Sequence, residues 1–514
     1  MLLLQANTTS LFDVADLQLI APELILTLCA CIALVMEVIL PYRKSKLTAY
    51  FALVGIVLAG LSLGVQWWGM PPGVTLDGFY GMVRIDGFAL LFKSVFLISA
   101  ALAIGISIRY LDIEGEQHGE YYALVLFATV GMMFLACGYD LITLYIGLEL
   151  MALTFYVLVA FTKRQKKSNE AAMKYFLLGA FSSGVLLYGM SLLYGIAGST
   201  NVGEITQAIN STIGNLQGTA ENANATLRPM LLLAMIALAA GLFFKIAAVP
   251  FHMWAPDVYE GAPTSVTAFL STGSKAASFA LYARIFIEAL GGMRADWAPL
   301  LAIVAAITIM VGNWAAVTQE NSKRLLAYSS ISNAGYLLLG LVAGNSYGYV
   351  GLVIYLLVYT LMNMGAFGVI ISLRRRGMIG DNVDDLTGLG QKAPGLAAMM
   401  TVFMLSLGGL PVTGGFIGKY FLFGGLIQRG TAEHKNWYYW LAVWAILNTV
   451  VSFYYYFRFI KVMYLGDRIA DDKPLSLSPA LQTALAVSLA GIIFVGVYPQ
   501  PFVKVAQQLL QYLS

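Results

Sequence analysis

Apolar stretches of about twenty residues, each long enough to cross a hydrocarbon core about 30 Å thick as a helix, recur from one end of this chain to the other. Short links rich in Gly, Pro, Asp or basic residues separate them, as turns between helices should. The pattern predicts an all-α polytopic membrane protein with about fourteen transmembrane helices. We expect these helices near residues 18–40, 47–68, 86–108, 120–138, 140–161, 171–197, 229–249, 262–289, 297–316, 325–343, 347–373, 395–427, 437–461 and 479–498.

The basic residues predict the orientation of these helices. If the N-terminus lies outside, the odd-numbered links face the cytoplasm and hold eighteen of the thirty Lys and Arg residues, against seven on the other side. This asymmetry follows the positive-inside rule, so both termini are predicted on the outer side. Lys93 and Lys174 lie near helix ends, where a long side chain can reach the interface. Lys245, Lys275 and Lys419 have no such route.

Segments seven and twelve are both interrupted near their middle. Segment seven holds Lys245 and Pro250, and segment twelve holds Pro411, a run of glycines and Lys419. A proline removes one backbone donor and disturbs the preceding turn of a helix. Because five helices separate the two segments and five is odd, a five-helix unit copied once would be inverted in the membrane. Interrupted segments at matching places in two halves indicate a central transport site.

The expected fold class therefore includes two inverted five-helix repeats with discontinuous helices seven and twelve. We expect residues 1–514 to form a single transmembrane domain in four parts. These parts are an N-terminal three-helix segment (1–118), a first five-helix repeat (119–290), a second five-helix repeat (291–465), and a C-terminal helix and tail (466–514).

One carboxylate lies at the depth of the three remaining lysines. Glu149 is near the centre of segment five, with Tyr145 one turn earlier on the same face. Ionisable groups inside a bilayer usually face the bundle interior, pair with one another, and mark ion or proton paths. A static pair of Glu149 with Lys245 that only holds two helices together remains an alternative.

A polar stripe runs along segment eight. Its members are three or four residues apart, which places them on one helical face: Thr264, Thr267, Ser271, Lys275, Ser278 and Tyr282. In a membrane such a stripe must face other helices or water. Because this one contains a lysine, it indicates a hydrated path.

These residues predict a proton relay. Withdrawal from water favours the neutral form of a lysine, and a nearby carboxylate favours the charged form, so a change at Glu149 would switch Lys245 between holding and releasing a proton. A helix break frees backbone carbonyls and admits water at mid-depth. Lys245, Lys275 and Lys419 are therefore expected to form a lateral chain that links two half-channels. His252, which follows the first break, is either a switch or a cap on the cytoplasmic side.

Composition adds limits to this picture. The chain is 59% hydrophobic and 11% charged, and its three cysteines and three histidines are scattered along it. This distribution indicates neither a disulfide framework nor a zinc or iron–sulfur site. We therefore expect no metal and no cofactor on this chain, the lipid bilayer as its surroundings, and no nucleic-acid partner.

Four stretches carry a resemblance to a known family. They read SNEAAMKYFLLGAFSSGVLLYGMSLLYG (168–195), FKIAAVPFHMWAPDVYEGAPTSVTAFLSTGSKAASFA (244–280), ENSKRLLAYSSISNAGYLLLG (320–340) and LTGLGQKAPGLAAMMTVFMLSLGGLPVTGGFIGKYFLF (386–423). The chain resembles subunit N of bacterial NADH:quinone oxidoreductase, an antiporter-like membrane subunit of respiratory complex I. The motif PFHMWAPDVYEGAPT is specific to the antiporter-like subunits, and GSKAA and GKY favour subunit N.

The resemblance implies an activity and an assignment of residues. It implies that Glu149 and Lys245 serve a first half-channel, Lys275 a connection, and Lys419 a second half-channel. The accessory candidates are His252, Pro250, Pro411, Tyr145, Ser271 and Ser278. The chain would be a proton-translocating subunit of an enzyme whose NADH, FMN, iron–sulfur clusters and quinone are bound by other subunits, with no redox chemistry of its own. Its partners would be the other subunits, especially sister antiporter-like subunits, in the bacterial inner (plasma) membrane.

Two other readings remain open. A subunit of a multisubunit cation/proton antiporter or of a membrane hydrogenase would use the same scaffold, although the 168–195 stretch argues against it. A structural spacer subunit with no working channel is the other reading. The set of central ionisable residues speaks against the spacer.

Overall fold

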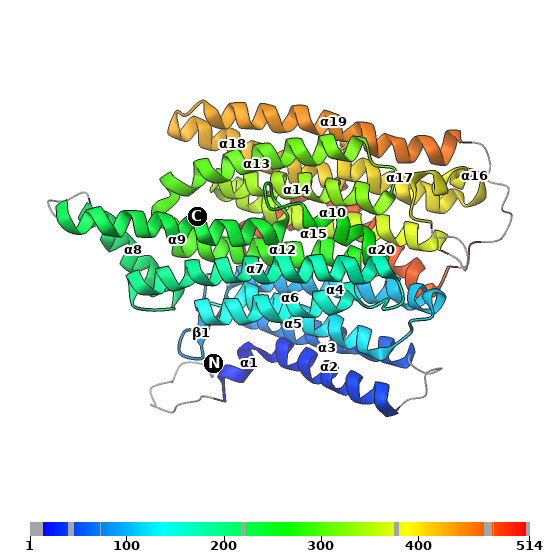
Figure 1. The fold of residues 1–514 in the computed structure, drawn as a ribbon, viewed down its shortest axis with the longest axis horizontal. Helices are drawn as coiled ribbons and strands as arrows, with labels where there is room; N and C mark the ends of the chain where they lie inside the picture. The colour runs from blue at the N-terminus through cyan, green and yellow to red at the C-terminus, as the bar shows by residue number, and fades with distance from the viewer. Residues whose placement is uncertain are drawn as a thin grey trace.

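Most of the chain forms helices that run side by side along one long axis (Figure 1). The computed structural model describes residues 14–39, 46–71, 73–216, 221–374, 380–466, 475 and 477–509. The all-α fold predicted from the apolar pattern is confirmed, and the sheet found in these residues is one short hairpin.

The N-terminal part holds three long helices and this hairpin. In the hairpin Leu76 lies opposite Ile85 in antiparallel register. Asp86 follows the second strand and accepts a hydrogen bond from the Ala89 amide (2.7 Å), which caps the next helix. The elements are α1 (Asp16–Leu19), α2 (Ala21–Ile39), α3 (Lys46–Gly69), β1 (Leu76–Gly78), β2 (Val83–Ile85) and α4 (Gly87–Glu114).

The middle of the chain contains the first interrupted segment. Asp140 caps α6 through the Ile142 amide (2.8 Å) and accepts a hydrogen bond from Thr200, which ties α6 to the link after α7. The elements are α5 (Gly119–Cys137), α6 (Leu141–Val159), α7 (Lys166–Ala197), α8 (Val202–Leu216), α9 (Glu221–Ile246), α10 (Trp254–Gly261), α11 (Thr264–Phe269), η2 (Leu270–Ser274), α12 (Lys275–Tyr282) and η3 (Ala283–Ala289).

The last part of the chain contains the second interrupted segment. Asn321, Asn345 and Ser478 each cap the helix that follows them with a side-chain oxygen. The elements are η4 (Gly291–Met293), α13 (Arg294–Val317), α14 (Ser322–Ala343), α15 (Ser346–Leu373), η5 (Val383–Leu386), α16 (Leu389–Lys392), α17 (Pro394–Gly408), α18 (Gly414–Glu433), α19 (Trp437–Leu465), α20 (Pro479–Val497) and α21 (Gln500–Leu509).

Twelve helices among the described residues are long and apolar enough to cross a membrane. Two of the expected segments are not among them, because 262–289 is divided by π-helical turns and 395–427 by a break between α17 and α18. A count of fourteen requires each divided segment to be a crossing, so it stays a prediction. The division into parts at 118, 290 and 465 likewise stays a prediction.

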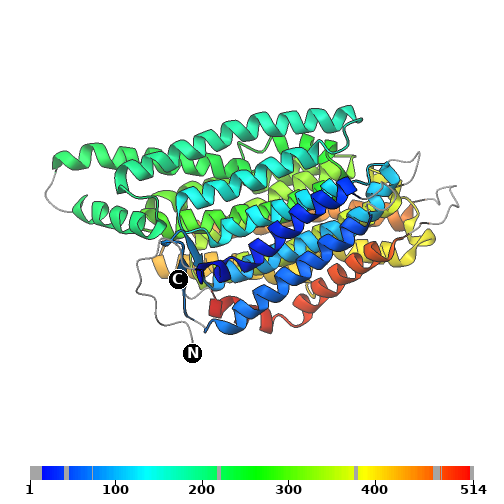
Figure 2. The same ribbon diagram turned by 90° about the horizontal axis from the view of Figure 1, so that it is seen from below.

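The helices at the two ends of the chain lie at the same end of the bundle. Gln66 on α3 donates hydrogen bonds to the carbonyls of Gln18 (2.8 Å) and Leu19 (3.0 Å) in α1, and Val505 on α21 faces the residues that follow α3. In Figure 2 the blue N-terminal helices run beside the red C-terminal helix, and α4 packs on α20. This agrees with an even number of crossings.

The side of the membrane on which this end lies stays a prediction. Several basic residues that support the predicted orientation lie outside the described residues: Arg43, Lys44, Arg375, Arg376, Arg468 and Lys473.

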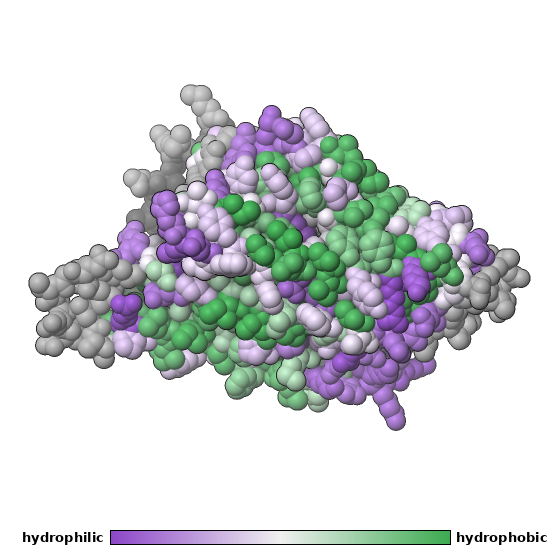
Figure 3. Space-filling view, turned by 90° about the horizontal axis from the view of Figure 1, so that it is seen from above, coloured by the Kyte–Doolittle hydropathy of each residue, from purple (hydrophilic) through white to green (hydrophobic). Residues whose placement is uncertain are grey.

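Large apolar side chains cover the middle of the bundle. Figure 3 shows apolar surface across the central part of one face, with polar residues toward the ends. Phe176, Leu177 and Phe181 on α7 are among the exposed members. In a bilayer such a belt contacts lipid or neighbouring subunits.

The expectation that Lys93 reaches the interface is wrong. Its side chain is fully buried, and its Nζ lies 2.5 Å from Oε1 of Glu23, which is 1% exposed. Cys137 on α5 also contacts this carboxylate (Sγ to Oε1, 3.6 Å). The partner comes from α2, so position along α4 alone does not reveal it. Lys174 behaves as expected: its side chain is 43% exposed and binds Glu170.

Candidate proton-transfer site

Segment seven breaks where Pro250 predicted it would. Helix α9 ends at Ile246, and α10 begins at Trp254. Between them Ala247 has a left-handed backbone (φ 57°), and the Val249 amide donates a hydrogen bond to Oγ1 of Thr308 (3.0 Å). A neighbouring helix thus provides an acceptor for one backbone group that the break releases.

Lys245 lies in the last turn of α9, directly before this break. Its side chain is 7% exposed, and its Nζ donates a hydrogen bond to Oγ of Ser183 on α7 (3.2 Å). Glu149 acts on Lys245 electrostatically. However, these two side chains, both among the described residues, do not form an ion pair within 4.0 Å. The arrangement is therefore not the closed static pair considered from the sequence.

Glu149 lies on α6 beside two tyrosines. Its Oε1 is buried and lacks a hydrogen-bond partner among the described residues, as does the hydroxyl of Tyr156 two turns further along. Tyr145, one turn earlier, also lies within electrostatic range of the carboxylate. Buried polar atoms are normally paired, so these two mark a place where a proton or water would be stabilised.

Lys275 lies at a change of helix geometry. Segment eight passes from α11 through the π-helical turn η2, and Lys275 opens α12 directly after it. The lysine is 3% exposed, and its Nζ donates to both the carbonyl oxygen and the hydroxyl of Ser330 on α14. The hydroxyl of Tyr359 donates to the hydroxyl oxygen of Ser330 (2.9 Å). Single π-turns inside helices occur frequently at functional sites.

The accessory serines of segment eight are bound to their own helix. Ser271 donates to the Ala268 carbonyl (2.9 Å) and Ser278 to the Ser274 carbonyl (2.8 Å). Both hydroxyl protons are therefore engaged, and only the oxygen lone pairs remain for a neighbour.

Segment twelve breaks around Pro411 and presents free carbonyls to a lysine. Helix α17 ends at Gly408, Gly409 takes a left-handed conformation (φ 87°) that suits glycine, and α18 begins at Gly414. Lys419 on α18 donates from Nζ to the carbonyls of Leu407 (3.0 Å) and Gly408 (3.1 Å). The last carbonyls of a helix carry partial negative charge, so they stabilise an ammonium group.

Two further candidates lie in or near the breaks. His252 is half-buried between α9 and α10, and its Nδ1 is a buried nitrogen for which the described residues supply no hydrogen-bond partner. Whether it acts as a switch or a cap stays open. Pro250 and Pro411 lie in the links themselves, where the helices would otherwise continue.

The three central lysines share one property. Each is buried, and the hydrogen bonds that the described residues accept from Lys245, Lys275 and Lys419 end on neutral hydroxyl or carbonyl oxygens. A buried ammonium without a contacting carboxylate is only partly compensated, whereas the neutral amine is tolerated. Such a group can take up or release a proton without breaking a buried ion pair.

Comparison with known proteins shows the family of this chain. A family model described as NADH:quinone oxidoreductase/Mrp antiporter, TM, matches residues 138–447. A relative from Solibacter usitatus (strain Ellin6076), named NADH-quinone oxidoreductase subunit N 2, is 49% identical over 492 residues, which cover 95% of this chain and 96% of the relative. The chain belongs to the subunit N family of NADH-quinone oxidoreductase.

Solved structures agree with this membership. A chain of respiratory complex I from Thermus thermophilus, with bound aureothin, is 31% identical to this subunit N protein, with a TM-score of 0.75 and coverage of 95% of this chain and 99% of that one. A chain of the Mrp complex from Dietzia sp. DQ12-45-1b is 19% identical, with a TM-score of 0.81 and 98% coverage of both chains, and shows the shared fold alone. This subunit N protein is therefore a subunit of a multisubunit membrane complex, and the antiporter or hydrogenase reading is not favoured.

Sequence reasoning missed the polar residues of α14 in this subunit N protein. Asn333 accepts a hydrogen bond from the hydroxyl of Tyr355 (2.6 Å), Ser329 contacts the hydroxyl of Tyr456 (2.5 Å), and the Tyr336 ring lies 4.7 Å from Nζ of Lys419. With Ser330 these side chains line the interior between Lys275 and Lys419. Their signal was the helical spacing of Ser329, Asn333 and Tyr336 within LLAYSSISNAGY, although each residue alone is common in helices.

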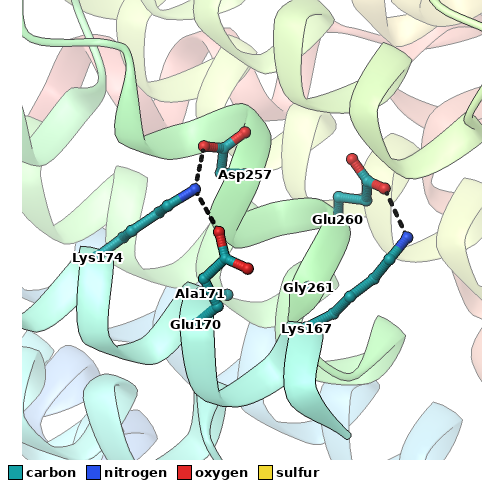
Figure 4. Close-up of a pocket in the computed structure, with 7 residues that line it drawn as sticks. All are labelled: Lys167, Glu170, Ala171, Lys174, Asp257, Glu260 and Gly261. Carbon is teal, nitrogen blue, oxygen red and sulfur yellow. Dashed lines mark hydrogen bonds and ion pairs between the residues drawn. The ribbon is translucent and has the colours of Figure 1, made fainter.

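Charged residues fix the short helix after the first break. In Figure 4, Lys174 on α7 reaches Asp257 on α10 (2.9 Å), and Lys167 reaches Glu260 (3.2 Å). Arg324 on α14 binds the same two carboxylates at 2.9 and 3.1 Å. Ion pairs therefore hold α10 from both α7 and α14. Among the described residues, no such ion pair involves the link between α9 and α10.

The described residues contain no group of three or more His, Cys, Asp or Glu side chains that could hold a metal ion.

Proposed function

We propose that this subunit N protein translocates protons within NADH:quinone oxidoreductase, driven by electron transfer in other subunits. The observation that supports the proposal is the set of three buried lysines whose hydrogen bonds to the described residues end on neutral oxygens, two of them at helix breaks and one at a π-turn. A lysine in this setting can change its protonation when water or a neighbouring charge moves.

The residues have distinct parts in the proposed relay. Glu149 and Lys245 form the first half-channel, in which movement of the carboxylate relative to the lysine controls whether Lys245 keeps its proton. Lys275 passes the charge toward α14 through Ser330. Lys419 serves the second half-channel, where the carbonyls at the end of α17 stabilise its charged form.

The accessory residues support these steps. Tyr145 lies beside Glu149, Ser271 and Ser278 offer acceptor oxygens along segment eight, and His252 lies in the first link. Pro250 and Pro411 keep the two helices interrupted.

The proposed cellular setting is supported by the family membership of the chain. NADH, FMN, the iron–sulfur clusters and the quinone are bound by other subunits, and this chain carries out no redox step. Its neighbours are sister antiporter-like membrane subunits in the bacterial inner membrane, and both termini lie on the outer side. The two halves that contain the breaks are inverted five-helix repeats.

The test replaces each central lysine in the assembled complex. Lys245→Met, Lys275→Met and Lys419→Met are expected to lower NADH-driven acidification of inverted vesicles by at least about tenfold, because a positioned proton-transfer group contributes roughly 10²–10⁴-fold. Assembly is checked on a native gel, where this subunit must migrate in one large complex together with NADH dehydrogenase activity.

The matched control is Lys461→Met, which removes an exposed lysine from α19. It is expected to leave acidification unchanged. Normal acidification in all three assembled lysine variants would contradict the proposed relay and restore the structural spacer reading.

A further inference from the structure

A cavity opens at the end of the bundle where α8 lies, away from the central lysines. Its volume is about 500 Å³, and its lining includes Arg84, Asp86, Tyr139 and Glu288. A cavity of this size with several polar groups has room for a cluster of water molecules. It brings several charged and polar side chains together around one hollow at this end.

A buried arginine, Arg284, lies behind the wall of this cavity and binds two of the carboxylates that line it. Arg284 is one of the seven basic residues counted on the outer side from the sequence, and its side chain is 1% exposed. It donates to the Ala136 carbonyl from Nε (3.0 Å), and its guanidinium binds Asp86 (2.8 Å) and Glu288 (2.6 Å). An arginine fully withdrawn from water persists only with such compensation.

The two carboxylates bound to Arg284 differ in how firmly they are held. Asp86 receives two guanidinium contacts and the Ala89 amide, so its ionised form is saturated with donors. Glu288 receives one arginine contact and faces the Tyr139 hydroxyl, and 16% of its side chain remains exposed. Glu288 is thus the carboxylate that can take up a proton from water in the cavity.

The charges around Glu288 favour this exchange. The single positive charge of Arg284 balances only one of the two carboxylates bound to it, Asp86 and Glu288. Arg84 is paired with Asp77 (2.7 Å) and stacks on the Tyr139 ring (3.5 Å). Helix α8 contributes the neutral side chains of Thr206 and Gln207 to the lining. When Asp77, Asp86 and Glu288 are all ionised, they and the two arginines together carry one excess negative charge. Binding of a single proton removes this charge.

Glu288 lies near the end of the helical run that also holds Lys275. From Lys275 the run passes through α12 and the π-helical η3 without a break, and thirteen residues at the α-helical rise correspond to about 20 Å. This connects the cavity to the proposed relay by one rigid element.

We propose that Glu288, held by Arg284 beside this cavity, is the group through which the relay exchanges protons with water at the α8 end of the molecule. This inference rests on the proposed function, since it assumes that protons cross the chain. The proton moves between the carboxylate oxygen of Glu288 and a water molecule, and Arg284 and Asp86 position the carboxylate.

The experiment uses the assembled complex in liposomes. Glu288→Gln keeps the shape of the side chain but cannot carry a proton, and it is expected to lower protons translocated per NADH several-fold, with Glu288→Asp restoring part of the loss. The matched control Glu204→Gln removes an exposed acid from α8 at the same end but outside the cavity lining, and translocation should stay normal.

A second pair of variants tests the charge directly. Gln207 is exposed on α8 and lines the cavity. A nearby ammonium favours an ionised carboxylate and a nearby carboxylate favours a protonated one. Gln207→Lys should therefore move the pH profile of translocation to lower pH, and Gln207→Glu to higher pH. A purely structural role for Glu288 would leave both profiles unchanged.

The outcomes separate this inference from the proposed function. Normal translocation by Glu288→Gln, or unchanged profiles for both Gln207 variants, overturns the inference, while loss of translocation in the lysine variants leaves the proposed function standing. If Glu288→Gln does not assemble, the Gln207 pair decides.

Discussion

At the residue scale, the hydrogen bonds of the central lysines end on oxygens that themselves belong to wider networks. Ser330 is the clearest case, because one hydroxyl contacts Lys275 and accepts from Tyr359, and the hydroxyl of Tyr259 lies 3.4 Å away. A hydrogen bond to a charged group contributes about 1.5–3 kcal/mol. The protonation of Lys275 therefore depends on this serine.

Ser330→Ala is expected to slow NADH-driven proton translocation by about tenfold, since 1.4 kcal/mol corresponds to a factor of ten. The measurement is acidification of inverted vesicles at a matched amount of complex. Ser372→Ala is the control, because that buried hydroxyl donates only to its own helix at Val369. Equal translocation in both variants would show that Ser330 has no part in the relay.

The sequence pattern identified candidate site residues where an ionisable side chain stands inside an apolar segment. Glu149, Lys245, Lys275 and Lys419 were found in this way. Serines and tyrosines of α14 and α15 do not conflict with a helix, so nothing in the pattern ranked Ser330 above its neighbours. Glu23, the partner of Lys93, and Asp86, a partner of Arg284, are distant from them in the chain, so the sequence pattern did not reveal these ion pairs.

At the element scale, both interruptions hold a non-glycine residue in the left-handed region. These residues are Ala247 (φ 57°) in the first link and Val412 (φ 75°) in the second. The left-handed conformation costs an ordinary residue about 1–2 kcal/mol, and such strain is concentrated at functional sites. The breaks are therefore maintained against the local preference of the chain. Proline and glycine predicted them, whereas the π-turns of segment eight depend on packing and were not predictable.

Gly409→Ala tests the geometry of the second break. An added Cβ would meet a left-handed backbone and lie 3.0 Å from Cδ of Lys419, so we expect a loss of about 1–2 kcal/mol of stability. The measurement is the temperature at which the detergent-extracted complex loses this subunit, which should fall by a few degrees. Gly64→Ala in α3, where a Cβ meets nothing within 4 Å, should not lower it. Equal temperatures would contradict the strained break.

At the scale of the whole molecule, the two ends of the bundle differ in character. One end carries α1, β1 and α8, and the other carries the link between α6 and α7 with its basic residues (Figure 1). The apolar pattern predicted the bundle and its breaks because a bilayer forces helices of fixed length. The way the helices pack beside one another depends on side-chain contacts, which periodicity does not contain.

Single cysteines at the two ends test the predicted orientation. Arg164→Cys lies in the α6–α7 link and Glu204→Cys on α8, and both positions are exposed. In a background that lacks Cys29, Cys31 and Cys137, a membrane-impermeant maleimide should label Arg164→Cys in inverted vesicles and Glu204→Cys in right-side-out vesicles. The reverse labelling pattern would invert the topology and place the Glu288 cavity on the cytoplasmic side.

The buried pair of Glu23 and Lys93 bears on how the chain enters the membrane during synthesis. A lone lysine in a segment leaving the translocon costs about 2.5–3.5 kcal/mol. Helix α2, which carries the matching carboxylate, is made first, so α4 can integrate stably once it docks against a helix already in the bilayer. A shortened relative that loses α2 must therefore also lose the charge at position 93, because otherwise its biogenesis would stall on an uncompensated ammonium.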